Sequence, residues 1–192
     1  MVDRPTSGAR LAALRAMASP VRQEILSDLG NGPASAREIA ARLGRSRQAV
    51  HFHIGALERA GLLRVREVRG TGREQERVYE RGGTRITGPL ASGAERAAAA
   101  KAAGAMLRLT QRELGSALRC GGGARPVAVR AKARLDERGE ARLRRLIQEM
   151  VTLFRRAKGR NAGRPMLALT LVLTPAAQSK AAPRQIRKGG GR

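Results

Sequence analysis

The sequence predicts an α+β fold, in which helices and a β-hairpin are followed by a long helix and a small β-α-β C-terminal domain. Three observations lead to this prediction. Apolar residues recur at helical spacing between capping signals over residues 7–61, strand-like patterns take over at residues 62–80, and both patterns return after residue 93. The 192 residues suffice for one domain with an appendage or for two small domains.

Signals for helix ends divide the first part of the chain. Ser7 can cap a first helix. Ser19 followed by Pro20 is typical of a cap and a first helical position, so a second helix begins there, and the run Gly30-Asn31-Gly32-Pro33 ends it. We therefore expect two short helices before residue 30.

A third and a fourth helix follow. Ser35 and Glu38 have the spacing of a capping box, in which each side chain bonds the other residue's free backbone N–H. The third helix ends at Gly44, and after a tight turn Ser46 can cap a fourth helix that runs to Gly61. Stepping 100° per residue gives this fourth helix one apolar face, which must be buried and is formed by Val50, Ile54 and Leu57.

The pattern changes at Leu62. The stretch LLRVREVRGTGREQERVYE contains two extended segments around Gly70-Thr71-Gly72, which predicts a β-hairpin. Helices in this order, with a glycine-containing turn between the third and the fourth and a hairpin after them, indicate a winged helix-turn-helix. In that fold the second helix of the motif enters the major groove of DNA.

The rest of the chain predicts one long helix and a strand-helix-strand unit. An Ala-rich helix is expected from about Ala94 to Arg119, and small apolar residues alternate with Arg and Lys over Pro126–Leu135, as in a half-buried strand. Residues 136–158 form a strongly amphipathic helix, and MLALTLVLTP at residues 166–175 is a second strand candidate. The basic tail from residue 176 is expected to be disordered.

The chain is strongly basic, with a net charge of +24, and the excess is uneven. Residues 1–90 contain 16 Lys and Arg against 9 Asp and Glu, a net charge of +7, whereas residues 91–192 contain 23 against 6, a net charge of +17. Such a chain attracts polyanions, with nucleic acid the first expectation and anionic membrane surfaces the second.

The lone Cys120 excludes an intramolecular disulfide and a cysteine-built zinc site, and it fits a reducing compartment. It is expected to be an ordinary thiol at a helix end rather than a redox-sensitive one.

The first residues lack a signal-peptide stretch and no run approaches a membrane span, so we expect a soluble cytoplasmic protein with no membrane partner. An enzyme is the least supported class, because the sequence lacks a Gly-rich phosphate loop and a plausible nucleophile–base pair; no cofactor is expected.

The two histidines of the chain, His51 and His53, lie on either side of Phe52 in the fourth helix. They are about 200° apart around that helix, so they cannot hold one ion together, because chelating pairs on helices are three or four residues apart. His53 lies at the edge of the buried face, where we expect a partly buried imidazole bonded to a nearby backbone group. No metal site is predicted.

The outward side of the fourth helix is the predicted DNA-reading surface. Arg47 can pair with guanine and Gln48 with adenine, each through two hydrogen bonds. His51, at the rim of this surface, contacts a phosphate or a base edge, or is a solvated surface histidine. Phe52 points outward, where it contacts either a thymine methyl group or the wing or a partner subunit.

Other predicted contacts come from the ends of neighbouring elements. Arg69 and Arg73 flank the glycine turn at the tip of the hairpin, where they can reach phosphates or enter a minor groove. Ser35, Arg45 and Ser46 lie at helix starts, where hydroxyls and free N–H groups suit phosphate contacts, although capping alone would also explain the two serines.

Residues 10–82 resemble the winged helix-turn-helix domain of ArsR-type bacterial transcription regulators. The matching features are the S-P-x-R-x-x-I-L opening helix, the E-I-A-x-x-L-G helix, the V-x-x-H-I-x-x-L recognition helix, and A-G-L-L leading into the wing and its tyrosine. The resemblance implies a homodimer that binds an inverted-repeat operator in double-stranded DNA, usually as a repressor released by an effector. The position of His53 is commonly histidine in this family, which implies a scaffold role.

The chain departs from the metal sensors of that family. Their third helix carries a cysteine-containing box, whereas the matching SAREIAARLG has no cysteine, and their C-terminal histidine and carboxylate ligands have no counterpart. The long C-terminal region resembles instead that of a non-metal-sensing branch, in which extra helices and strands follow the wing.

These features predict a sequence-specific DNA-binding transcription regulator that acts as a homodimer. The expected units are a DNA-binding domain, a dimerisation helix with a linker, an effector or accessory domain that could take a small anionic ligand, and a basic tail, at residues 1–90, 91–125, 126–175 and 176–192. The alternative is a chromosome-associated protein that binds nucleic acid without sequence preference through its basic C-terminal half, because phosphate neutralisation needs charge but no base readout.

Overall fold

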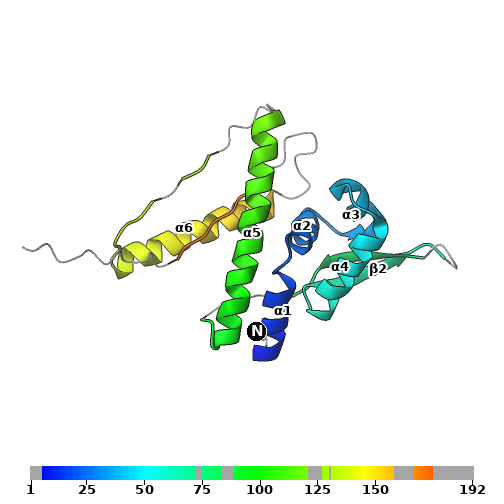
Figure 1. The fold of residues 1–192 in the computed structure, drawn as a ribbon, viewed down its shortest axis with the longest axis horizontal. Helices are drawn as coiled ribbons and strands as arrows, with labels where there is room; N and C mark the ends of the chain where they lie inside the picture. The colour runs from blue at the N-terminus through cyan, green and yellow to red at the C-terminus, as the bar shows by residue number, and fades with distance from the viewer. Residues whose placement is uncertain are drawn as a thin grey trace, which may run out of the picture.

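The computed structural model describes residues 6–71, 75–83, 89–120, 127–129, 131–157 and 167–174. Its first part contains four helices, which are α1 (Ser7–Ala16), α2 (Pro20–Asp28), α3 (Ala36–Leu43) and α4 (Arg47–Arg59). All four predicted helices of this part are therefore present. They lie to one side of a long fifth helix (Figure 1).

The helix ends follow the predicted capping signals, with one exception. The capping box between Ser35 and Glu38 is formed, and Gly44 ends α3 in the left-handed conformation, with φ of 60°. Thr6 rather than Ser7 caps α1, because the Ser7 hydroxyl instead donates to Glu95, 88 residues away (3.0 Å). Only the tertiary structure could reveal that competing partner.

Three short strands form one antiparallel sheet in the order β1-β3-β2. The hairpin is formed by β2 (Leu63–Arg69) and β3 (Glu76–Arg81), and β1 (Ala34–Ser35) adds a two-residue edge that the sequence did not indicate. Val65 is paired with Tyr79 but Glu67 with Val78, so a bulge lies between the two pairs. The wing is thus attached to the start of α3 through β1.

The core beneath the sheet is built from aliphatic residues and Tyr79. Its fully buried members include Ile25, Ile39 and the predicted inner face of α4, which is formed by Val50, Ile54 and Leu57. Burial of this face orients the opposite side of α4 towards solvent. The prediction of the helical phase is therefore confirmed.

The long helix α5 (Gly93–Cys120) packs against α1 and α2. Small residues make this close approach possible, and its buried face consists of Ala98, Ala102, Ala105 and Leu109. The buried side chain of Gln23 joins α2 to α5, since its amide donates to the carbonyl oxygens of Met17 (2.7 Å) and Ala102 (2.8 Å). This helix and the preceding elements thus share one packed body.

The amphipathic helix α6 (Glu137–Arg156) is present, and the Asp136 carboxylate caps it by accepting from the N–H of Gly139 (2.8 Å). Much of its apolar side faces solvent, with Leu146 46% and Leu153 66% exposed. Of the described part of the chain, no helix is long and apolar enough to cross a membrane.

The two strands predicted on either side of α6 are not formed in the residues that the structure describes there, 127–129, 131–136 and 167–174. The β-α-β prediction was wrong in this respect, although its helix is confirmed. The alternating pattern is real, but a strand also needs a neighbour for its backbone hydrogen bonds. Val127 and Val129 are instead more than four-fifths exposed.

Candidate nucleic-acid interface

The outward side of α4 brings several of the predicted reading residues onto one surface. The Ser46 hydroxyl caps the helix by accepting from the N–H of Ala49 (3.2 Å), and the first turn behind it is solvent-exposed. Phe52 is 69% exposed although the chain contains only two phenylalanines. Together with Ser46 and Phe52, the exposed set on this side comprises Arg47, Gln48 and His51.

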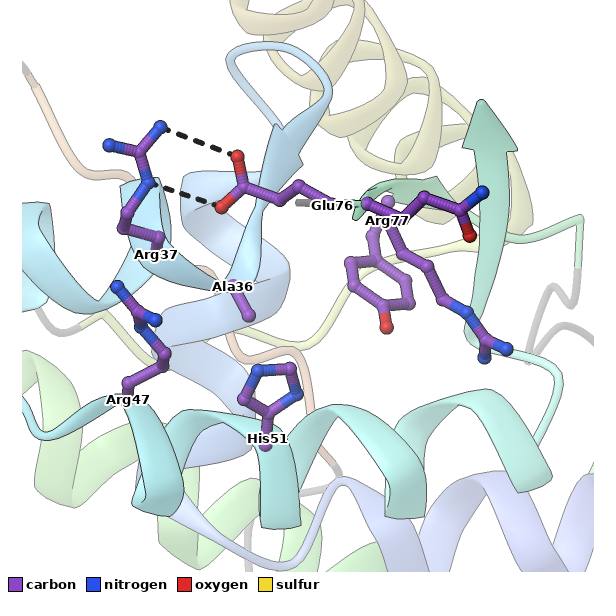
Figure 2. A pocket seen from close by; sticks show the side chains of 8 residues that line it. Ala36, Arg37, Arg47, His51, Glu76 and Arg77 are labelled. Carbon is purple, nitrogen blue, oxygen red and sulfur yellow. Dashed lines mark hydrogen bonds and ion pairs between the residues drawn. The ribbon is translucent and has the colours of Figure 1, made fainter. Parts of the chain in front are cut away.

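A cavity of about 730 Å³, which we call the notch, lies between the start of α4, the start of α3 and strand β3. The side chains that define it are Arg37, Arg47, His51, Glu76, Arg77 and Tyr79. Figure 2 shows Arg47 and His51 rising from α4 on one side, and Glu76 and Arg77 coming from the wing strand on the other. The notch thus joins α4 to the wing, and three arginines are among its lining residues.

Glu76 is the acidic residue among those that line the notch. Arg37 binds it with two nitrogens, Nε to Oε1 at 3.2 Å and Nη2 to Oε2 at 3.4 Å (Figure 2). This pairing is the main cause that holds the pKa of Glu76 below its usual value; a hydrogen bond with the Ser35 side chain comes next, and the charge of Arg47 adds to both. The carboxylate is therefore ionised at neutral pH.

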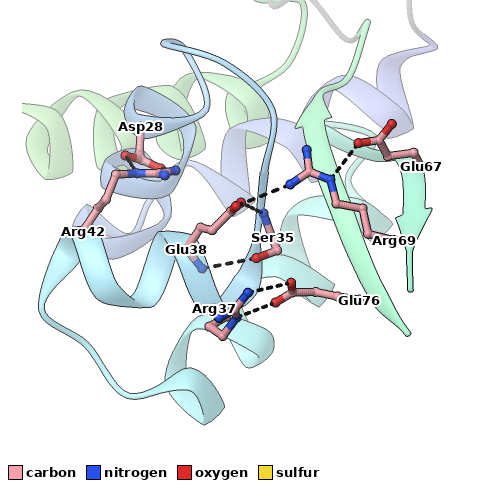
Figure 3. A network of polar contacts seen from close by, with 8 residues as sticks. All are labelled: Asp28, Ser35, Arg37, Glu38, Arg42, Glu67, Arg69 and Glu76. Carbon is pink, nitrogen blue, oxygen red and sulfur yellow. Dashed lines mark hydrogen bonds and ion pairs between the residues drawn. The ribbon is translucent and has the colours of Figure 1, made fainter. Parts of the chain in front are cut away.

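Arginines of the wing and of α3 are also paired with carboxylates (Figure 3). Arg69 contacts Glu67 on its own strand (2.9 Å) and Glu38 on α3 (3.4 Å). The backbone N–H of Ser35 donates to Glu38 (2.7 Å), and this bond is the main cause that lowers the pKa of Glu38. The predicted contact Arg69 is thus half-exposed and accessible but partly neutralised, whereas Arg73 lies outside the described residues.

Two of the predicted contacts point away from the surface. Ser35 is fully buried, and its hydroxyl accepts from the N–H of Glu38 (3.2 Å), so its cap role accounts for it. Arg45 turns inward to Glu24 on α2 (2.7 Å), and the other oxygen of that carboxylate accepts from Arg112 on α5. In this conformation neither side chain is presented to a ligand on the α4 surface.

The structure separates the two histidines, as their helical phase predicted. His51 is exposed, whereas His53 is half-buried and its ring meets that of Phe52 edge-on at 5.3 Å. The expected hydrogen bond of His53 is not seen at Nδ1, which is buried without a partner among the described residues. Burial, followed by the charges of Arg22 and Arg45, lowers the pKa of His53, so its imidazole is neutral at physiological pH.

Sequence reasoning missed Arg37 and Glu76 as members of this site. They are 39 residues apart, and each taken alone is an ordinary surface charge. Only the pairing of β1 with β3 places the start of α3 beside the start of the wing strand. The periodicity of apolar residues does not reveal how β1 pairs with β3, so no signal in the sequence could have identified the pair.

A match to a protein family agrees with this geometry. Residues 17–66, from just before α2 to the middle of β2, match the family described as "Helix-turn-helix domain". A comparison with curated proteins found no match. Among solved structures, the chain is similar to an ArsR-like transcriptional regulator from Rhodococcus sp. RHA1, with 27% identity over 61% of this chain and 96% of that chain, at a TM-score of 0.33.

The motifs, the family match and the local fold point to the same type of domain. The match covers the two helices of the motif and the turn between them, and the three-stranded sheet supplies the wing. The chain therefore carries a winged helix-turn-helix domain, in which α4 is the second helix of the motif.

Proposed function

We propose that the protein is a sequence-specific DNA-binding transcription regulator. The observation that carries this proposal is the first turns of α4, whose exposed side presents Arg47, Gln48, His51 and Phe52 together beside the wing. In a helix-turn-helix these positions face base edges in the major groove. The proposed DNA contacts also include Ser46 and Arg69, at the rim of the same surface.

The chemistry of these side chains suits direct readout. The guanidinium of Arg47 can bond O6 and N7 of guanine, and the amide of Gln48 can bond N6 and N7 of adenine. The exposed ring of Phe52 offers an apolar contact for a thymine methyl group. These contacts would supply sequence preference, whereas arginines along the wing would supply phosphate contacts.

We propose further that two chains bind an inverted repeat as a homodimer, and that the regulator acts as a repressor of the non-metal-sensing kind. Helix α5 is the proposed dimerisation element. One face of it packs on α1 and α2, and two leucines elsewhere on it remain exposed, Leu107 at 49% and Leu118 at 66%. Figure 1 shows α5 extending well past α1, so its later turns lie beyond that contact.

The test is selection of bound duplexes from a random pool by the full-length protein. A sequence-specific dimer should recover a motif with two related half-sites. Arg47→Ala and Gln48→Ala should each relax the preference at one position of each half-site, and each lost bidentate contact is worth about 1–3 kcal/mol of discrimination. Recovery of no motif would contradict the proposal.

A second candidate function is general binding of nucleic acid by the C-terminal half. Its net charge of +17 favours this candidate, as does the exposure of arginines along α6. Such a protein would bind all duplexes about equally and lose affinity for all of them together as salt rises. The accessory region could also hold a small anionic effector, which would raise the melting temperature in a ligand screen.

A further inference from the structure

We infer that Glu76 is an internal competitor of DNA, because its carboxylate occupies the notch where a backbone phosphate would bind. In this role it lowers the affinity of the domain for any duplex, whatever its sequence. The inference rests on the proposed function, since it assumes that DNA approaches the α4 surface. It adds a residue that regulates phosphate binding to the residues that read bases.

The geometry of the Glu76–Arg37 pair is that of an occupied phosphate site. Two guanidinium nitrogens of Arg37 contact the two carboxylate oxygens at 3.2 and 3.4 Å. Arginine binds carboxylates and phosphates in this same two-pronged way, so one group can replace the other. The side chain of Arg37 is 64% exposed and that of Glu76 29%, so solvent reaches the arginine more freely than the carboxylate.

The charges around the notch support this role. Arg37, Arg47 and Arg77 bring three positive groups to it, and Glu76 is the negative group among its lining residues. Arg47 is the first residue of α4, and its field acts on Glu76. A phosphate that entered the notch would meet three cations but would also lie close to a fixed negative charge.

This arrangement changes what binding to DNA requires. A phosphate that reaches Arg37 must exchange the intramolecular pair for an intermolecular one. An arginine that is already neutralised by a carboxylate also contributes less to the release of counterions from DNA, which is the main source of affinity without sequence preference. In a chain of net charge +24, such a competitor reduces trapping on random DNA.

The experiment measures the binding of full-length variants to a random duplex and to the duplex that the wild type selects, across a range of salt concentrations. Glu76→Gln should bind the random duplex roughly three- to tenfold more tightly at constant salt, and the slope of log K against log salt should steepen by about 0.9, the value of one added phosphate contact. Glu76→Asp keeps the charge and should retain the wild-type slope.

A charge-matched control lies outside the domain. Glu140 on α6 pairs with the exposed Arg144 at 2.6 Å, so Glu140→Gln removes the same charge from a similar pair far along the chain. It should leave the affinity and the slope unchanged. Arg37→Ala, added to Glu76→Gln, should abolish the gain, because the freed guanidinium is its source.

Three results would overturn the inference. These are a Glu76→Gln protein with the wild-type affinity and slope, an equal gain in Glu140→Gln, and a gain that persists without Arg37. Failure of the proposed function would give a different experimental result. A wild-type protein that selects no motif contradicts sequence-specific regulation, whereas the salt slope on the random duplex still tests Glu76.

Discussion

The two ends of the molecule differ in how they use apolar residues. Between α1 and the middle of α5, the apolar face of each helix is buried against a neighbour, and the inner-face residues of α4, which are Val50, Ile54 and Leu57, have no more than 2% of their surface exposed. In α6 the apolar and polar residues are separated more clearly onto two faces than in α4, yet Leu153 is 66% and Phe154 39% exposed. The comparison teaches that an amphipathic pattern predicts a helix, but its burial depends on what the rest of the chain supplies.

The largest expected effect contrasts the two regions directly. Ile54→Ala removes a fully buried side chain from the core under α4 and should lower the free energy of unfolding by about 2–5 kcal/mol. The matched change Leu153→Ala in α6 should alter it by about 0.5 kcal/mol or less, because the side chain is already exposed. Chemical denaturation followed by circular dichroism measures both, and equal losses would contradict the comparison.

A second prediction concerns the joint between α2 and α5. Gln23→Leu leaves the carbonyl oxygens of Met17 and Ala102 without their shared donor and should cost about 1–3 kcal/mol of stability. It should also speed amide hydrogen exchange in α5. Gln148→Leu, at an exposed position of α6, is the control and should do neither. Unchanged exchange in the Gln23 variant would show that α5 is held without the hydrogen bonds of Gln23.

A third prediction separates the reading of bases by α4 from the general attraction of DNA by positive charge. Phe52→Ala should weaken binding to the selected duplex by up to about 1 kcal/mol more than binding to a random duplex, because only the selected sequence offers the methyl contact. Arg69→Ala in the wing removes a half-exposed charge from a proposed phosphate contact and should weaken binding to both duplexes alike. Competition gel shifts with the two duplexes check this, and an unchanged preference in the Phe52 variant would remove it from the reading surface.

The smallest expected effect is a pH dependence from His53. Its folded-state pKa is lowered by burial and by nearby arginines, so the folded state binds a proton less readily than the unfolded chain. The stability linked to this residue is therefore fully present above the unfolded pKa of about 6.5 and is lost as pH falls through the lower folded value. Unfolding midpoints between pH 7.5 and about 5 should fall less in His53→Gln than in the wild type.

Much of the first region could be predicted from the sequence, because its signals are local. The Ser35–Glu38 box, the glycine that ends α3 and the face of α4 depend on residues three or four positions apart. What could not be predicted depends on distant partners. Ser7 turns to Glu95, Arg45 turns to Glu24, and Arg37 meets Glu76 only because β1 pairs with β3.

The two strands predicted around α6 are absent from the described residues there for a related reason. The alternating pattern in residues 127–135 and in residues 167–174 can be read from each segment alone. A strand, however, forms only when a second segment pairs with it through backbone hydrogen bonds. Thr110 of α5 and Thr170 share a hydrogen bond of 2.6 Å, which connects the last described segment to the packed body without a sheet. A single side-chain contact of this kind leaves no trace in sequence periodicity.

The position of Tyr79 has a practical consequence for optical spectroscopy. It is the single tyrosine of a chain without tryptophan, it is 4% exposed, and its ring lies between the core and the notch. The tyrosine fluorescence of the unlabelled protein therefore originates from this one place beside α4. Occupation of the notch and loosening of the core can both be followed by that emission, with no dye or engineered probe.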